Sequence, residues 1–156
     1  MKRDIVPSNT SDIFCLSFNS DPMSVRNAIQ AVNLAIGHLI KSTDELTSIE
    51  IVLTEVTSNI VEHSYQKIGG KPIDLRVSPY RLGLEFEFVD YGLAMPNGEI
   101  PANVPQDFNC PVADLPESGF GWPLIHRLAS GLEYTRVGDE NHLRFYFSVR
   151  DSAETD

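Results

Sequence analysis

The chain has 156 residues, 42% of them apolar, which is enough for one ordinary domain with its own core. Its 12 Lys and Arg residues against 22 Asp and Glu residues give a formal net charge of −10. Such an acidic surface repels nucleic-acid phosphates and anionic lipids, so neither nucleic acid nor a membrane is an expected partner. The average electrostatic potential of the surface does not exclude a local basic patch around a nucleotide site.

The N-terminal sequence and the cysteines indicate a reducing compartment. No apolar run near the N-terminus is long enough for a signal peptide or a membrane span. Cys15 and Cys110 are far apart and follow no metal-ligand spacing, so two unbridged, buried thiols are expected. We therefore expect a cytoplasmic protein.

The first part of the chain predicts a strand followed by an amphipathic helix. Residues 12–18 alternate in part between apolar and polar side chains and include aromatics, which favours a short strand. Pro22 is typical of a first helical turn. A helix is expected over residues 23–41, because apolar side chains recur there at helical spacing.

A second helix is expected directly after the first. Ser42 and Glu45 have the spacing of a capping box, and the helix they begin runs to about residue 65. Residues 66–72 contain two glycines and a proline, which end this helix. Its buried stripe is predicted to consist of Leu46, Ile49, Leu53, Val56 and Ile60.

The second half of the chain predicts strands on either side of a long loop. Residues 90–119 carry five prolines with little periodicity and cannot form one regular element. Long loops in compact domains are usually functional. The other predicted elements are strands at 73–77 and 82–89 joined through 78–81, a helix at 122–129, and a terminal hairpin of strands at 132–137 and 143–149.

Three polar residues of the second predicted helix share one face. Glu55, Asn59 and His63 stand at four-residue intervals, and a regular helix stacks them with a rise of about 6 Å per step. The trio offers little charge complementarity, so on spacing alone a solvated face is as good an interpretation as a functional site. His63 has a further interpretation, as a buried histidine that packs the helix end.

Two glycine-containing segments favour the functional interpretation. Asp90 follows a predicted strand, where its carboxylate can accept a hydrogen bond from an exocyclic amine, while Gly92 lets a planar ring approach the backbone. Gly119 and Gly121 precede the short helix, whose N-terminal amides and dipole attract phosphate. Either segment alone is a common turn.

Together and in this order, the three segments resemble the nucleotide-binding boxes of the GHKL superfamily of gyrase-type ATPases, chaperones, histidine kinases and mismatch-repair proteins. Within it the chain is similar to the anti-sigma-factor serine/threonine-protein kinases of bacterial partner-switching systems, because it is short and has no phosphoacceptor helix pair before the ATPase domain. The resemblance implies an α+β fold, a two-layer α/β sandwich of the Bergerat type with a mixed, mostly antiparallel sheet and helices on one face. We expect an N-terminal extension at residues 1–11, the ATPase domain at 12–150 and a disordered tail at 151–156.

The resemblance also implies ATP and Mg²⁺ as ligands. Asn59 would coordinate the Mg²⁺ that bridges the phosphates, Asp90 would bind adenine, and Glu55 would act as the catalytic base. Residues 95–118 would form a lid over ATP. The residues implied to contact the nucleotide are Asn59, His63, Asp90, Gly92, Ala94, Gly119, Phe120 and Gly121.

Two departures from the superfamily pattern concern the adenine side of the site. Ala94 stands where many members have a second glycine. The final hairpin lacks the Gly-Thr pair that often touches this side, and Asn141 is the candidate substitute.

Three functions are compatible with these residues. The first is a cytoplasmic, homodimeric kinase that phosphorylates a small STAS-type anti-sigma-factor antagonist and, in another state, binds a sigma factor. The second is a nucleotide-gated binding switch, an anti-sigma or adaptor protein with little or no catalysis. Glu55 argues against it, because a pure binder needs no carboxylate one turn before a metal-binding Asn59. The third is a protein-contact fold without a nucleotide site.

Overall fold

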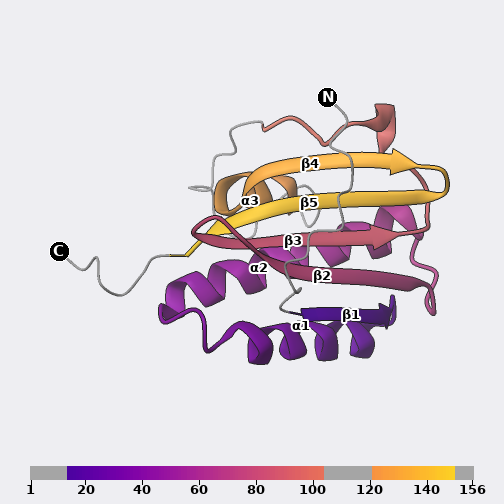
Figure 1. Cartoon of the computed structure of the whole chain (residues 1–156). Coiled ribbons are helices and arrows are strands. Elements are labelled where there is room, and N and C mark those ends of the chain that lie inside the picture. Colours follow the sequence, from indigo (N-terminus) through magenta and orange to yellow (C-terminus); the bar gives the residue numbers. More distant parts are fainter. Residues whose placement is uncertain (1–13, 104–120, 150–156) are drawn as a thin grey trace, which may run out of the picture.

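The chain folds into an antiparallel sheet covered by helices on one face (Figure 1). The computed structural model describes residues 14–103 and 121–149. Within them the five-stranded sheet has the order β1-β2-β3-β5-β4, and each neighbouring pair is antiparallel. The predicted α+β sandwich with a mostly antiparallel sheet is confirmed. The elements are β1 (Phe14–Asn19), α1 (Pro22–Ile36), α2 (Thr43–Asn59), the π-helical turn η1 (Ile60–Ser64), β2 (Pro72–Tyr80), β3 (Gly83–Asp90), the 3-10 turn η2 (Pro96–Gly98), α3 (Gly121–Leu128), β4 (Ser130–Val137) and β5 (Glu140–Ser148).

The core lies between the helices and the inner face of the sheet. Strands β3 and β5 bury every second residue there, and Phe86 stacks on its cross-strand partner Phe145 with ring centroids 5.4 Å apart. Helix α2 contributes Val52, Leu53 and Val56, all without exposed surface. Burying a side chain of this size stabilises the fold by about 1.5–3 kcal/mol. This apolar layer fixes α2 against the sheet.

Helix α1 is shorter than its periodicity predicts. It ends at Ile36, and the Gly37 amide donates to the carbonyl of Asn33 at 2.9 Å. Ile40, which the pattern assigns to the same helix, is buried beyond the turn. The apolar spacing therefore predicts correctly that Ile40 is buried, but it assigns this residue to the wrong element.

Strand β2 is longer than predicted. The ladder to β3 continues through Pro79, opposite Leu84, and the turn lies at residues 81–82 instead of 78–81. Pro79 stands beyond Val77, the last β2 residue with a described partner in β1. Among the described residues, the missing backbone N–H of Pro79 therefore costs no ladder bond to β1. Arg81 turns the chain with a positive φ of 52°.

The remaining predictions from the sequence concern the two cysteines, the chain ends, the lid and membrane spans. Cys15 is exposed on β1, so its predicted burial is wrong; Cys110 lies outside the described residues. So do the predicted extension, the tail and most of the predicted lid. Within the described ranges, no helix has the length and apolar character to span a membrane.

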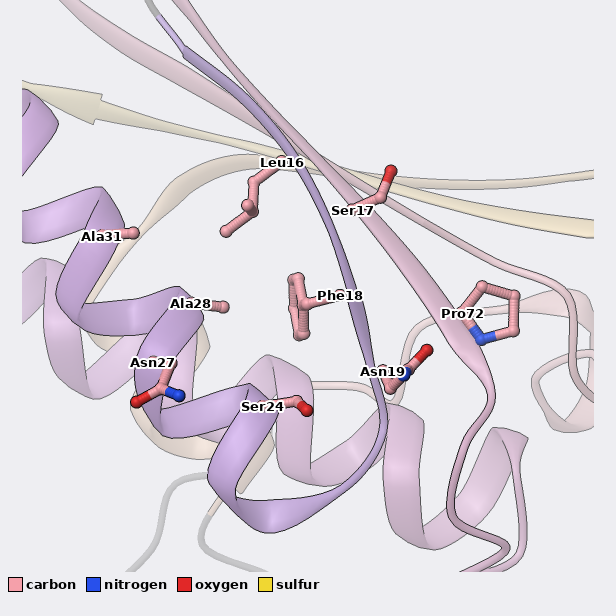
Figure 2. Close-up of a pocket in the computed structure, with 9 residues that line it drawn as sticks. All are labelled: Leu16, Ser17, Phe18, Asn19, Ser24, Asn27, Ala28, Ala31 and Pro72. Carbon is pink, nitrogen blue, oxygen red and sulfur yellow. The ribbon is translucent and has the colours of Figure 1, made fainter.

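A groove of about 530 Å³ separates β1 from the first turns of α1. Figure 2 shows Leu16 and Phe18 of β1 facing Ala28 and Ala31 of α1. The two small alanine side chains leave this space unfilled. No residue that lines the groove belongs to the cavity of the candidate site described below.

Helix α2, which carries the candidate site, begins at a capped Ser42 as predicted. The Ser42 hydroxyl accepts a hydrogen bond from the backbone amide of Glu45 at 3.3 Å. Asp44 and Glu45 place negative charge in the first turn, where the helix dipole favours it.

Ser42→Ala removes this cap and should lower the free energy of unfolding by about 1 kcal/mol, measured by urea denaturation. Thr47→Ala is the matched control, one turn further on, where the Thr47 hydroxyl bonds back to the Thr43 carbonyl on an exposed surface. Since Ala has the higher helix propensity, the control should be neutral or slightly stabilising. Equal destabilisation by both substitutions would contradict the capping role.

Candidate functional site

A cavity of about 440 Å³ opens between the end of α2, the segment after β3, the start of α3 and strand β5. Its walls are mostly apolar, as in small-molecule sites, with a few polar groups that can orient a ligand. Four of the residues implied to contact the nucleotide line it: Asn59, His63, Asp90 and Ala94. The cavity is also lined by Val56, Ile60, Ser64, Leu93, Met95, Pro96, Pro101, Trp122, Tyr134, Asn141 and Leu143.

Asp90 ends β3 in the wall of this cavity and is only 5% exposed. Its Oδ1 accepts hydrogen bonds from the Gly92 amide at 3.0 Å and from Asn141 Nδ2 at 2.9 Å. The Ser64 hydroxyl donates to the same oxygen. Among the described residues, no group donates to Oδ2. This second oxygen is therefore the acceptor that a ligand's amino group can use.

Gly92 has a packing role that the sequence did not predict. A Cβ on Gly92 would lie 2.3 Å from the Ser64 hydroxyl oxygen and 2.4 Å from the Ser64 carbonyl oxygen. The Leu93 amide also donates to this carbonyl at 2.9 Å. Glycine thus lets the segment after β3 pack on the end of the helix. Gly92 does not line the cavity, and its contact with a ligand ring stays a prediction.

Helix α2 ends in the π-helical turn η1, which no sequence pattern indicated. Its mark is the hydrogen bond from the Tyr65 amide to the Ile60 carbonyl, 2.9 Å long and five residues back. Such turns often occur at functional sites. Here it brings Ser64 against Asp90, a contact that the four-residue spacing missed. His63 is exposed and lines the cavity, so the interpretation as a buried packing histidine is wrong.

Glu55, Asn59 and Gly121 meet where α2 faces the start of α3. A Cβ on Gly121 would lie 3.1 Å from Glu55 Oε2 and 3.3 Å from Asn59 Oδ1. Asn59 Nδ2 is buried without a hydrogen-bond partner among the described residues. This N–H group is therefore a donor that a polar ligand can use. Of the predicted glycine segment, Gly119 and Phe120 lie outside the described residues.

The oxygens of Glu55 and Asn59 are hard donors of the kind that Mg²⁺ prefers. The described residues contain no group of three or more His, Cys, Asp or Glu side chains that could hold a metal ion by themselves. Magnesium usually takes one or two protein ligands and completes its shell with water and phosphate oxygens. The residues present therefore fit Mg²⁺ only together with a phosphate ligand.

Burial raises the pKa of Glu55 above its ordinary value of 4.5, and the negative charge of Glu62, two turns further on, raises it again. A carboxylate with a raised pKa is a better proton acceptor near neutral pH. Glu55 is only partly buried, so water can still exchange its proton.

Asn141 of β5 completes the polar wall and is 4% exposed. It pairs directly with Asp90 across the β3–β5 ladder. The candidate substitute for the missing Gly-Thr pair thus lies beside the carboxylate implied to bind adenine.

A known domain profile matches most of the chain. The profile of the histidine kinase-like ATPase domain covers residues 18–147. The chain belongs to this family. The family resemblance predicted from the sequence is therefore confirmed, and ATP is the ligand that this membership implies.

Similar proteins include the serine-protein kinase RsbW of Bacillus cereus (strain AH820), Bacillus anthracis (strain A0248) and Bacillus thuringiensis (strain Al Hakam). Each is 28% identical to this chain over 114 residues, which cover 72% of the chain and 71% of the relative. The family member described here is thus similar to bacterial protein kinases over most of its length.

Glu55→Gln removes a partly buried charge and should raise Tm by about 1–2 °C near neutral pH, a small gain because solvent screens the carboxylate. An acid whose pKa rises on folding lowers stability as pH increases from its ordinary value, 4.5, to the raised value. The gain should therefore vanish below pH 4.5 and be complete above the raised pKa. Calorimetry across this range measures it.

The control for this stability test is Glu50→Gln, an exposed substitution on the same helix. It corrects for the general benefit of removing one negative charge from an acidic protein. A gain for Glu55→Gln that matches the control, or that persists at low pH, would show that burial does not strain the Glu55 carboxylate.

Proposed function

We propose that this protein is an ATP- and Mg²⁺-dependent serine/threonine-protein kinase and anti-sigma factor of a partner-switching system. Its substrate is a small STAS-type anti-sigma-factor antagonist, and in another state it binds a sigma factor or another regulated protein. The observation that carries the proposal is the meeting of Glu55, Asn59 and Gly121 beside a cavity that also holds Asp90. The similarity to proteins named serine-protein kinase supports it.

The residues have separate roles in the proposed reaction. Asp90 Oδ2 accepts a hydrogen bond from the exocyclic amine of adenine. The missing side chain of Gly121 lets the start of α3 approach Glu55 and Asn59 closely, and Asn59 Oδ1 would hold Mg²⁺. When bound, Mg²⁺ neutralises charge on the phosphate oxygens.

Glu55 acts on the hydroxyl of the protein substrate. The γ-phosphoryl group moves from ATP to the serine or threonine oxygen, the bond from phosphorus to the ADP oxygen breaks, and the hydroxyl proton passes to Glu55. The raised pKa of Glu55 suits this proton transfer, since burial and Glu62 both favour the protonated product. Homodimerisation and a cytoplasmic location are part of the proposal, on the strength of the family resemblance.

Glu55→Gln should reduce phosphoryl transfer by at least about 100-fold, the loss expected for a general base, with ATP affinity nearly unchanged. Transfer is measured with labelled Mg-ATP and the STAS-domain proteins encoded in the same genome, and the modified residue is found by mass spectrometry. Glu50→Gln is the control and should transfer normally. Wild-type protein that modifies none of these substrates, while binding ATP tightly without turnover, would instead support the nucleotide-gated switch.

Asn59→Ala should weaken Mg-ATP binding by about tenfold or more, because it removes a ligand to a charged partner. With EDTA in place of Mg²⁺, the difference in affinity between variant and wild type should shrink to about two- or threefold, since the substitution then removes only one neutral hydrogen bond. Titration calorimetry measures both affinities. Ser58→Ala, one residue earlier and outside the cavity lining, is the control. An equal loss with and without Mg²⁺ would remove Asn59 from the metal site.

A further inference from the structure

The terminal hairpin reaches the cavity through a cluster of polar side chains. We propose that Asn141 is a positioning residue that fixes Asp90 to receive an amino group, and so makes the site select a 6-amino purine over a 6-oxo purine. The inference rests on the proposed nucleotide-binding function and deepens it. It assigns base selectivity to the hairpin of β4 and β5, where the sequence offered only Asn141 as a candidate on the adenine side.

The hydrogen-bonding capacity of Asn141 is fully used by the protein. Its Nδ2 donates to Asp90 Oδ1 at 2.9 Å and to the Leu93 carbonyl at 2.8 Å. Its Oδ1 accepts from Arg136 Nη1 at 3.0 Å and from the Tyr134 hydroxyl. A carboxamide has two N–H donors and one oxygen with two lone pairs. Asn141 therefore has no hydrogen-bonding capacity left for a ligand and acts on it through Asp90.

The neighbours of Asn141 allow only one orientation of its amide. The Arg136 guanidinium can only donate, and the Leu93 carbonyl can only accept. Rotating the amide by half a turn would set N–H groups against the guanidinium and an oxygen against the Asp90 carboxylate. The N–H side of Asn141 is thus held toward Asp90.

The same cluster ties the cavity wall to the hairpin. Arg136 Nη1 donates to the Gly92 carbonyl at 2.6 Å, and the Tyr134 hydroxyl accepts from the Met95 amide at 3.0 Å. Hydrogen bonds strengthen one another where the local dielectric is low, and Asn141 is buried. The segment after β3 and the Asp90 carboxylate are therefore held as one unit.

A fixed carboxylate discriminates between purines by their group at position 6. With Oδ1 occupied by three donors, Oδ2 is the oxygen of Asp90 that keeps unused capacity among the described residues, and Asp90 lines the cavity. The 6-amino group of adenine donates to it, whereas the 6-oxo group of hypoxanthine places an oxygen against an oxygen. Sites with buried, directed polar groups reject the mismatched analogue because those groups are left unpaired. A carboxylate free to rotate would lose part of this discrimination.

ATP and ITP test the inference, since they differ only at the base. Binding is followed by calorimetry or by the fluorescence of Trp122, the single tryptophan of the chain, which lines the cavity. Asn141→Ala should lower the ratio of Kd for ITP to Kd for ATP by about tenfold, mainly by weakening ATP, the size expected for one charge-assisted hydrogen bond. Tyr134→Phe, which removes one donor to Asn141, should lower the ratio by about two- to threefold.

Tyr146→Phe is the control on the same hairpin, where the Tyr146 ring packs against Tyr80 away from the cavity; its ratio should equal that of wild type. Equal weakening of both nucleotides by Asn141→Ala would overturn the inference. Should that variant fail to fold, an unchanged ratio in Tyr134→Phe overturns it as well. A wild type that binds ATP and ITP equally also overturns it but leaves the proposed function standing, whereas a wild type that binds neither removes both.

Discussion

The structure depends on the hydrogen bonds to one buried carboxylate, that of Asp90. A buried charge destabilises a fold by several kcal/mol unless hydrogen bonds replace the lost water. Three different parts of the fold provide those bonds: Ser64 at the end of the helix layer, the Gly92 amide after β3, and Asn141 in the neighbouring strand. Because these donors must converge on one oxygen, the helix end, the loop and the sheet are held in a fixed relation, and the cavity takes its shape from it.

Helix α2 serves two ends of the cavity because its hydrogen-bond register changes after Asn59. In a regular α-helix, Ser64 would lie about 140° around the axis from Asn59 and could not continue the same face. The π-helical turn η1 widens the end of the helix and so changes the direction in which Ser64 points. Glu55 and Asn59 face α3, while Ser64 faces Asp90. One continuous helical segment, α2 with η1, therefore positions Glu55, the Asn59 amide and a donor to the buried Asp90 carboxylate.

What the sequence could predict here is what depends on local patterns. The apolar spacing of α2, its Ser42 cap and the strand-end position of Asp90 follow from neighbouring residues, and each is seen in the structure. The contacts of Ser64 and Asn141 depend on the register change and on the β3–β5 pairing, which puts Asn141 opposite Asp90. No local pattern encodes either. The proline signal misplaced the turn at Pro79, because tertiary neighbours decide whether a missing backbone N–H matters.

The two ends of the cavity differ in whether their polar groups have hydrogen-bond partners within the described part of the protein. Around Asp90, each described donor and acceptor of Asn141 is paired, and the amide can take only one orientation. Around Asn59, the amide nitrogen is buried without a partner among residues 14–103 and 121–149, and burial raises the pKa of Glu55. Such unfavourable features persist where function requires them. The fold thus holds the polar groups around Asp90 in place by itself, whereas the Asn59 amide keeps a donor that none of the described residues uses.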